Sequence, residues 1–80
     1  MKKSLLKESV MFVTGRRKDL RVNGPKRIVE AFLNALVASK DLYEAIEEKN
    51  VSLSELQALI EHKEELAAAY KKKTGKDWPL

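Results

Sequence analysis

Two long segments of helical periodicity, separated by only three residues, restrict the fold of this chain more than any other feature. In the first, from Pro25 to about Lys49, apolar residues recur at spacings of four and three, with no further glycine or proline. The second runs from Leu53 to about Lys73 with the same spacing. Because so short a connection leaves two helices as antiparallel neighbours, the sequence predicts an all-α fold built on a long helical hairpin.

The ends of the second helix carry clear signals. Ser52 and Glu55 form a capping box, in which each side chain satisfies a free backbone N–H of the other's residue. Val51 and Leu56 are expected to pack as a hydrophobic staple around this cap. Gly75 is expected to end the helix, after three lysines in the last turn that suit the negative end of the helix dipole.

Each helix of the hairpin has a stripe of residues expected to face the core. In the first helix the stripe consists of Ile28, Phe32, Ala35, Ser39, Leu42 and Ile46. In the second it consists of Leu53, Leu56, Ile60, Lys63, Ala67 and Tyr70. The regular spacing predicts one continuous first helix, with no break near Ser39.

The N-terminal region allows two interpretations. Residues 4–13 favour a short helix that Ser4 could cap, but Val10 to Val13 are strand formers, and a small β-hairpin over residues 9–22 is the alternative. Asn23, Gly24 and Pro25 form a break, and Pro25 suits the first position of the next helix. We therefore expect a single domain over residues 1–80, divided into a basic N-terminal segment (1–24), a helical hairpin (25–74) and a tail (75–80).

Residues 28–38 are apolar on nearly all sides of their helix, with only Glu30 and Asn34 as interruptions. Such a helix must be covered on several sides, by the N-terminal segment, by a second subunit or by both. A homo-oligomer, most simply a dimer, is therefore expected. Trp78 either folds back over the hairpin or anchors a partner. The candidate interface residues are Ile28, Val29, Phe32, Leu33, Leu36, Val37 and Trp78.

The charges are divided along the chain, which has a net charge of +4. Residues 1–27 have a net charge of +7, residues 28–70 of −6, and residues 71–80 of +3. Basic side chains at both ends could neutralise phosphates of a nucleic acid, or they could pair with the acidic helices. The candidate nucleic-acid-binding residues are Arg16, Arg17, Lys18, Arg21, Lys26, Arg27, Lys71, Lys72, Lys73 and Lys76.

No catalytic motif is present, so we expect no enzyme, no cofactor or metal, and no small-molecule substrate. His62 is the only histidine and faces away from the apolar stripe, there is no cysteine, and no glycine-rich phosphate loop occurs. The acidic residues Glu44, Glu47 and Glu48 would need a cleft to act as catalysts. No apolar run is long enough for a signal peptide or a membrane span, and a cytoplasmic protein is expected.

Residues 41–78 resemble the WHEP domain, a helix-turn-helix appendix of eukaryotic aminoacyl-tRNA synthetases. The resemblance rests on the length from Asp41 to Tyr70 and on the ending Tyr-Lys-Lys-Lys-Thr-Gly-Lys-Asp-Trp-Pro over residues 70–79. It implies a helical hairpin and association with tRNA. The chain departs from the family at the first helix, where Glu44 and Glu47 stand in place of the basic residues expected to contact RNA.

Two functions follow from these patterns. The first is a non-catalytic protein-interaction, adaptor or regulatory module that self-associates, of a size that would suit a phage regulator. The alternative is a nucleic-acid-binding module, with tRNA as the first candidate, that uses the basic N-terminal segment and the lysine-rich tail. If the two basic regions converge on one face, nucleic acid is favoured, whereas basic regions at opposite ends favour protein partners.

Overall fold

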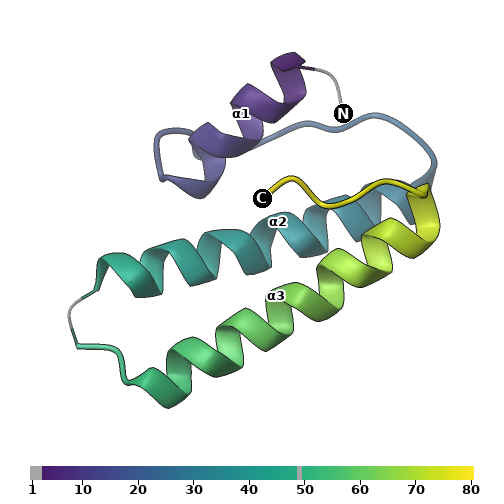
Figure 1. Ribbon diagram of the computed structural model, residues 1–80. Helices are drawn as coiled ribbons and strands as arrows, with labels where there is room; N and C mark the ends of the chain where they lie inside the picture. Colours follow the sequence, from purple (N-terminus) through teal and green to yellow (C-terminus); the bar gives the residue numbers. More distant parts are fainter. Residues whose placement is uncertain (1–2, 49) are drawn as a thin grey trace.

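The computed structural model describes residues 3–48 and 50–80. These residues form an all-α fold, and no strand occurs among them (Figure 1). Its helices are α1 (Lys3–Val13), α2 (Lys26–Glu47) and α3 (Leu53–Thr74). The long helices α2 and α3 pack together as an antiparallel hairpin, and α1 packs on α2. The predicted fold class is therefore confirmed, and the N-terminal region forms a short helix rather than a β-hairpin. Ser4 lies within that helix.

The first helix of the hairpin is shorter than predicted at both ends. Pro25 is its N-cap rather than its first helical residue, because its ψ of 136° is extended, while its carbonyl accepts a hydrogen bond from the N–H of Val29 (3.0 Å). At the other end, Glu48 is extended (φ −79°, ψ 130°), so the helix stops at Glu47. The predicted end at Lys49 lies outside the described residues. As predicted, α2 is continuous through Ser39.

Both ends of α3 lie where they were predicted, and of the predicted capping box the bond accepted by Ser52 is present. The hydroxyl of Ser52 accepts a hydrogen bond from the N–H of Glu55 (3.2 Å), which satisfies one of the free donors of the first turn. Gly75 adopts a left-handed conformation (φ 74°), and its N–H donates to the carbonyl of Lys71 (2.7 Å). Glycine suits this position because it alone has no Cβ penalty there.

The core lies where all three helices and the residues after Gly75 meet. Phe32 and Leu36 of α2 are buried together with Val13 of α1 and Tyr70 of α3. Trp78 packs on this cluster, with its ring centroid 5.3 Å from that of Phe32 and 5.0 Å from that of Tyr70, edge to face in both cases. The tail therefore folds back over the open end of the hairpin.

The elements that cover α2 are too short to cover all of it. At 1.5 Å per residue, α1 is about 16 Å long and α2 about 33 Å. The half of the hairpin that adjoins the turn is correspondingly less covered. Ile46 is 62% exposed, Leu53 83% and Ile60 42%, and Ile28 at the open end of the hairpin is 37% exposed, so the expectation that both stripes face the core is wrong at these positions.

Candidate interaction surface

A shallow apolar groove of about 200 Å³ opens at the boundary between the covered and uncovered halves of the hairpin. Four of its lining residues come from α2, and the others come from the end of α1, from α3 and from the folded-back tail. The lining residues are Ser39, Leu42, Tyr43 and Ile46, with Val13, Lys63 and Leu80. The groove is thus built by segments that are far apart in the sequence.

Exposed apolar side chains continue from this groove toward the turn. Ile60 lies three residues before Lys63, on the same side of α3, and Leu53 lies a further two turns back on that side. On α2, Tyr43 and Ile46 are likewise neighbours on one side. We call Leu42, Tyr43, Ile46, Leu53, Ile60 and Lys63 the turn surface.

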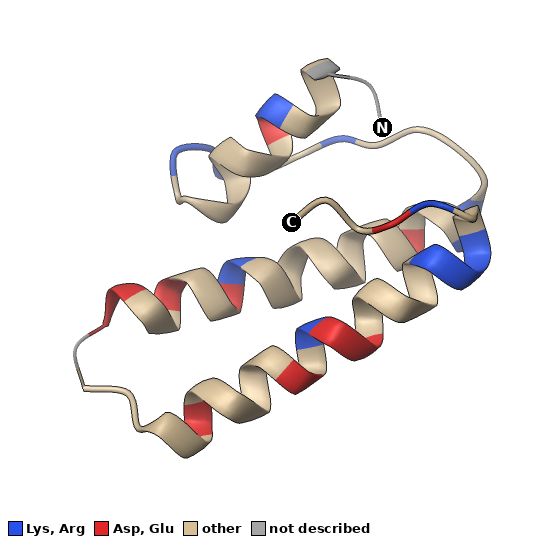
Figure 2. Ribbon diagram, in the orientation of Figure 1, with Lys and Arg blue, Asp and Glu red and all other residues tan. Residues whose placement is uncertain are grey.

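Carboxylates surround the turn surface. Residues 41–66 contain eight acidic residues and two lysines, a net charge of −6. Glu47 lies four residues after Tyr43, and Glu64 lies four residues after Ile60, so the two carboxylates flank the surface on its two helices. Both side chains are exposed. Figure 2 shows the acidic residues gathered toward the turn and along α3.

The chain itself covers much of the predicted dimer interface. Phe32 and Leu36 are buried in the core (3% and 0% exposed), and Val29, Leu33 and Trp78 are half-buried. Only Ile28 (37%) and Val37 (48%) remain exposed. The apolar run 28–38 is therefore covered from several sides, as expected, but by α1, α3 and the tail of the same chain. Self-association stays a prediction.

The predicted nucleic-acid-binding residues form two separate groups. The hairpin brings the start of α2 beside the end of α3, so one group collects at the open end (Figure 2). All of its members are exposed, and one of them, Lys71, pairs with Asp77 at 2.9 Å. We call this group the open-end cluster: Lys26, Arg27, Lys71, Lys72, Lys73 and Lys76.

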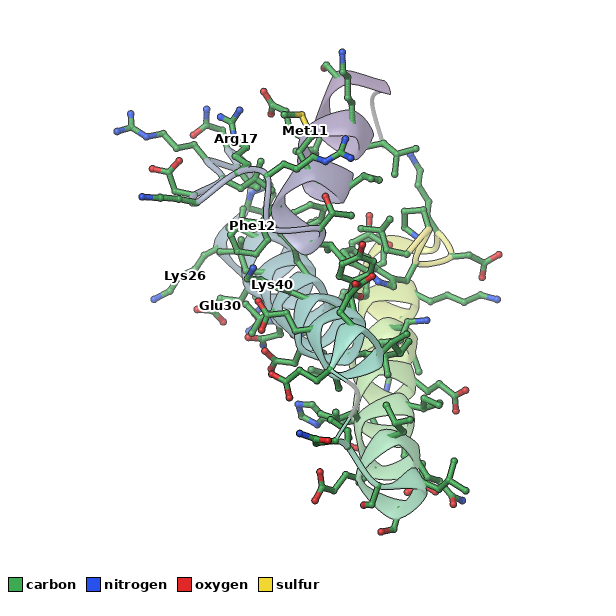
Figure 3. The ribbon with its side chains drawn as sticks, turned by 90° about the vertical axis from the view of Figure 1, so that its left-hand side faces the viewer. Met11, Phe12, Arg17, Lys26, Glu30 and Lys40 are labelled. Carbon is green, nitrogen blue, oxygen red and sulfur yellow. The ribbon has the colours of Figure 1, made fainter. Side chains whose placement is uncertain are left out.

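The second group follows α1, over Arg16 to Lys18, with Arg21 exposed further along the chain. Arg17 is partly engaged, because its Nε donates to the carbonyl of Asp19 (2.8 Å) and its guanidinium lies 3.8 Å from Glu8. Figure 3 shows Arg17 and Lys26 projecting toward the same side of the molecule. The basic regions thus converge only in part: the start of α2 joins the lysine-rich end, and the loop after α1 does not.

The described residues 3–48 and 50–80 hold no group of three or more side chains that could bind a metal ion. His62 and the three glutamates Glu44, Glu47 and Glu48 are exposed. No described helix is long and apolar enough to cross a membrane. The lining of the groove is almost entirely apolar.

Comparisons with family models, with curated proteins and with solved structures each found no match. The resemblance of residues 41–78 to the WHEP domain consequently stays a prediction. The shared feature that the structure bears out is the antiparallel helical hairpin itself.

The sequence did not indicate the groove, because periodicity shows which side of a helix is apolar but not whether another element covers it. One signal was available. The apolar stripes of the hairpin run to both ends of their helices, whereas the short N-terminal helix and the tail could cover only part of that length.

Proposed function

We propose that this chain is a small non-catalytic protein-interaction module that binds a partner through the turn surface. The observation that carries the proposal is the exposure of Ile46, Leu53 and Ile60 on the two helices of the hairpin, beside an apolar groove that Ile46 lines. Single exposed apolar residues are ordinary on protein surfaces, but a contiguous apolar area with a polar rim is typical of an interaction site.

The composition of the turn surface fits this role. It combines aliphatic side chains with one aromatic residue, Tyr43, beside the hollow. Interfaces commonly have an apolar centre, enriched in tyrosine, with charged residues at the rim. Here the rim is formed by carboxylates such as Glu47 and Glu64.

A photocrosslinking amino acid at position 46, in lysate of the source organism, tests this function. We expect crosslinks to one or a few proteins, and their loss when Ile60→Asn is added. The same label at Val37 is the matched control, since it is also half-exposed but lies nine residues, or 180°, from Ile46 around α2. Equal crosslinking at both positions, or none at position 46, would overturn the proposal.

Nucleic-acid binding is the second candidate, and the open-end cluster favours it. Six exposed basic residues from the start of α2, the end of α3 and the tail gather there, with Asp77 as a nearby acid. Such a cluster can neutralise phosphates and release counterions. The cluster lies at the end of the hairpin away from the turn, so this activity would use a different surface (Figure 2).

A further inference from the structure

We propose that the partner of the turn surface is an amphipathic helix whose apolar stripe is flanked by lysines or arginines. This inference rests on the proposed function and names the class of partner. Two observations lead to it: the kind of element that the hairpin already binds, and the charge around the uncovered surface.

The hairpin already holds one short helix with an apolar side. Helix α1 packs on α2 with Leu5, Phe12 and Val13 toward the core. Helix α1 has a net charge of +1, and the loop after it, residues 14–25, has a net charge of +3. Val13 at the end of α1 also lines the groove, so the turn surface begins where the site of α1 ends. An uncovered hairpin surface adjoining a docked helix has the form of a helix-binding site.

Contacts between α1 and α2 show how this docking combines apolar packing with charge. The ammonium of Lys40 lies 5.3 Å from the centroid of the Phe12 ring and 3.5 Å from the Phe12 carbonyl (Figure 3). Lys40 also pairs with Glu44 at 2.9 Å. Beside α1, the acidic surface of α2 is therefore partly neutralised, whereas the turn half has only two lysines among residues 41–66.

The charge of residues 41–66, the half of the hairpin that adjoins the turn, indicates which class of partner the turn surface favours. A net charge of −6 over residues 41–66 favours a basic partner, because interfaces combine potentials of opposite sign. It disfavours a second copy that presents its own turn surface, since the two acidic regions would face each other. Nucleic acids and anionic lipid surfaces are disfavoured for the same reason.

Lys63 lies at the groove end of the turn surface, away from the turn. It is half-buried and lines the groove, so its carbon chain contributes apolar contact while its ammonium lowers the affinity for a basic helix. Replacement of Lys63 by glutamine should therefore strengthen binding. No other residue of the turn surface carries a charge. A substitution at Lys63 therefore tests the sign of the partner's charge.

Fluorescence titration with designed peptides tests the inference. The probe is an amphipathic peptide of about 15 residues, with leucines on one side and lysines on the other, and the matched control replaces every lysine with glutamate. We expect the lysine peptide to bind the full chain at least about tenfold more tightly than the glutamate peptide at low salt, with the preference reduced by salt screening.

Variants locate the binding site. Ile46→Asn and Ile60→Asn should each weaken binding of the lysine peptide about tenfold, whereas Val37→Asn should leave it unchanged. Glu47→Lys should also weaken binding, with Glu30→Lys as the matched control for a glutamate outside the turn half. Lys63→Gln should strengthen it. Lys63 is half-buried and the other side chains are exposed, and circular dichroism will confirm that each variant is folded.

The outcomes separate this inference from the proposed function. Equal binding of the two peptides, or preference for the glutamate peptide, overturns the inference. The inference is also overturned if Val37→Asn weakens binding as much as Ile46→Asn, because the peptide would then not use the turn surface. If crosslinking at position 46 succeeds while the lysine peptide fails to bind, the interaction function stands and the partner is of another class. A crosslinked homodimer would likewise contradict a basic helix as the partner.

Discussion

The indole N–H of Trp78 donates a hydrogen bond to the hydroxyl of Ser39 (3.0 Å), across 39 positions of sequence. Ser39 is buried, and its own hydroxyl donates to the carbonyl of Ala35 (2.8 Å) one turn earlier in α2. The serine thus satisfies the polar end of the tryptophan, while Phe32 and Tyr70 contact its ring. This arrangement fixes the tail on the hairpin and closes one side of the groove, which Ser39 also lines.

Ser39→Ala should destabilise the chain. The substitution keeps the helix but removes the acceptor for the Trp78 N–H, and loss of one partner of a partly buried hydrogen bond costs about 1–3 kcal/mol. Trp78→Ala should cost more, about 2–4 kcal/mol, because most of the ring contact is lost as well. Urea unfolding followed by circular dichroism gives both free energies of unfolding.

A thermodynamic cycle with the double variant separates the hydrogen bond from the packing. If the bond is formed, Ser39→Ala should cost much less in the Trp78→Ala background than in the wild type. Strict additivity of the two changes would show that the tail does not rest on α2 in solution. Trp78 is the only tryptophan, so its fluorescence emission should also shift to longer wavelength in Ser39→Ala if the tail detaches.

The local signals in the sequence predicted the hairpin well, because each acts within a few residues. The Ser52 cap depends on Glu55, and the Gly75 terminus depends on one backbone conformation. The end of α2 was less accurately predicted. Glutamates continue the helical pattern through Glu48, although the chain is already extended at that residue. Nothing in the local composition marks the stop.

The candidate site could be predicted only in its parts. Charge division and apolar spacing are visible in the sequence, and both helices of the turn surface were expected. Which half of the hairpin stays uncovered depends on where α1 and Trp78 dock, and these contacts join residues far apart in the chain. Because of the same contacts, Phe32 and Leu36, which were predicted as interface residues, are buried in the core.

Ser52→Ala should lower stability by about 1 kcal/mol, because the N–H of Glu55 loses its acceptor at the start of α3. In a domain of this size such a change should lower the melting temperature by about 4–8 °C. Ser54→Ala is the matched control, since Ser54 is a nearby exposed serine whose hydroxyl contacts that of Ser52 but caps no backbone donor. Equal effects of the two substitutions, measured by thermal melts, would contradict the assigned cap.

Self-association through residues 28–38 can be tested without confusing dissociation with unfolding. The hypothesis predicts a sedimentation-equilibrium mass of at least twice 9.1 kDa at tens of micromolar. Val37→Asp should then restore the monomer with an unchanged melting curve, because Val37 is 48% exposed. Phe32→Asp should instead unfold the chain, since it buries a carboxylate in the core at a cost of several kcal/mol. A wild-type chain that sediments at 9.1 kDa would contradict this interface.

Nucleic-acid binding, if present, should depend on the open-end cluster more than on the loop after α1. The open-end cations are all exposed, whereas Arg17 is engaged by Glu8 and the Asp19 carbonyl. Affinity for bulk tRNA and for duplex DNA should fall by roughly 0.7–0.9 log units per phosphate contact for each decade of salt concentration. Replacing Lys26, Arg27, Lys73 and Lys76 with alanine should flatten that slope and weaken binding to all sequences alike.

The matched control replaces Arg16, Arg17, Lys18 and Arg21 with alanine, which removes the same number of charges. It should change the slope less, since this group lies apart from the lysine-rich end. If the control changes the salt dependence more, the binding site lies in the N-terminal segment. If the wild-type chain binds neither nucleic acid more tightly than about 100 μM at low salt, weaker than ordinary non-specific association, phosphate binding is excluded as its function. Lys71, Lys72 and Lys73 would then have the structural role of complementing the dipole at the end of α3.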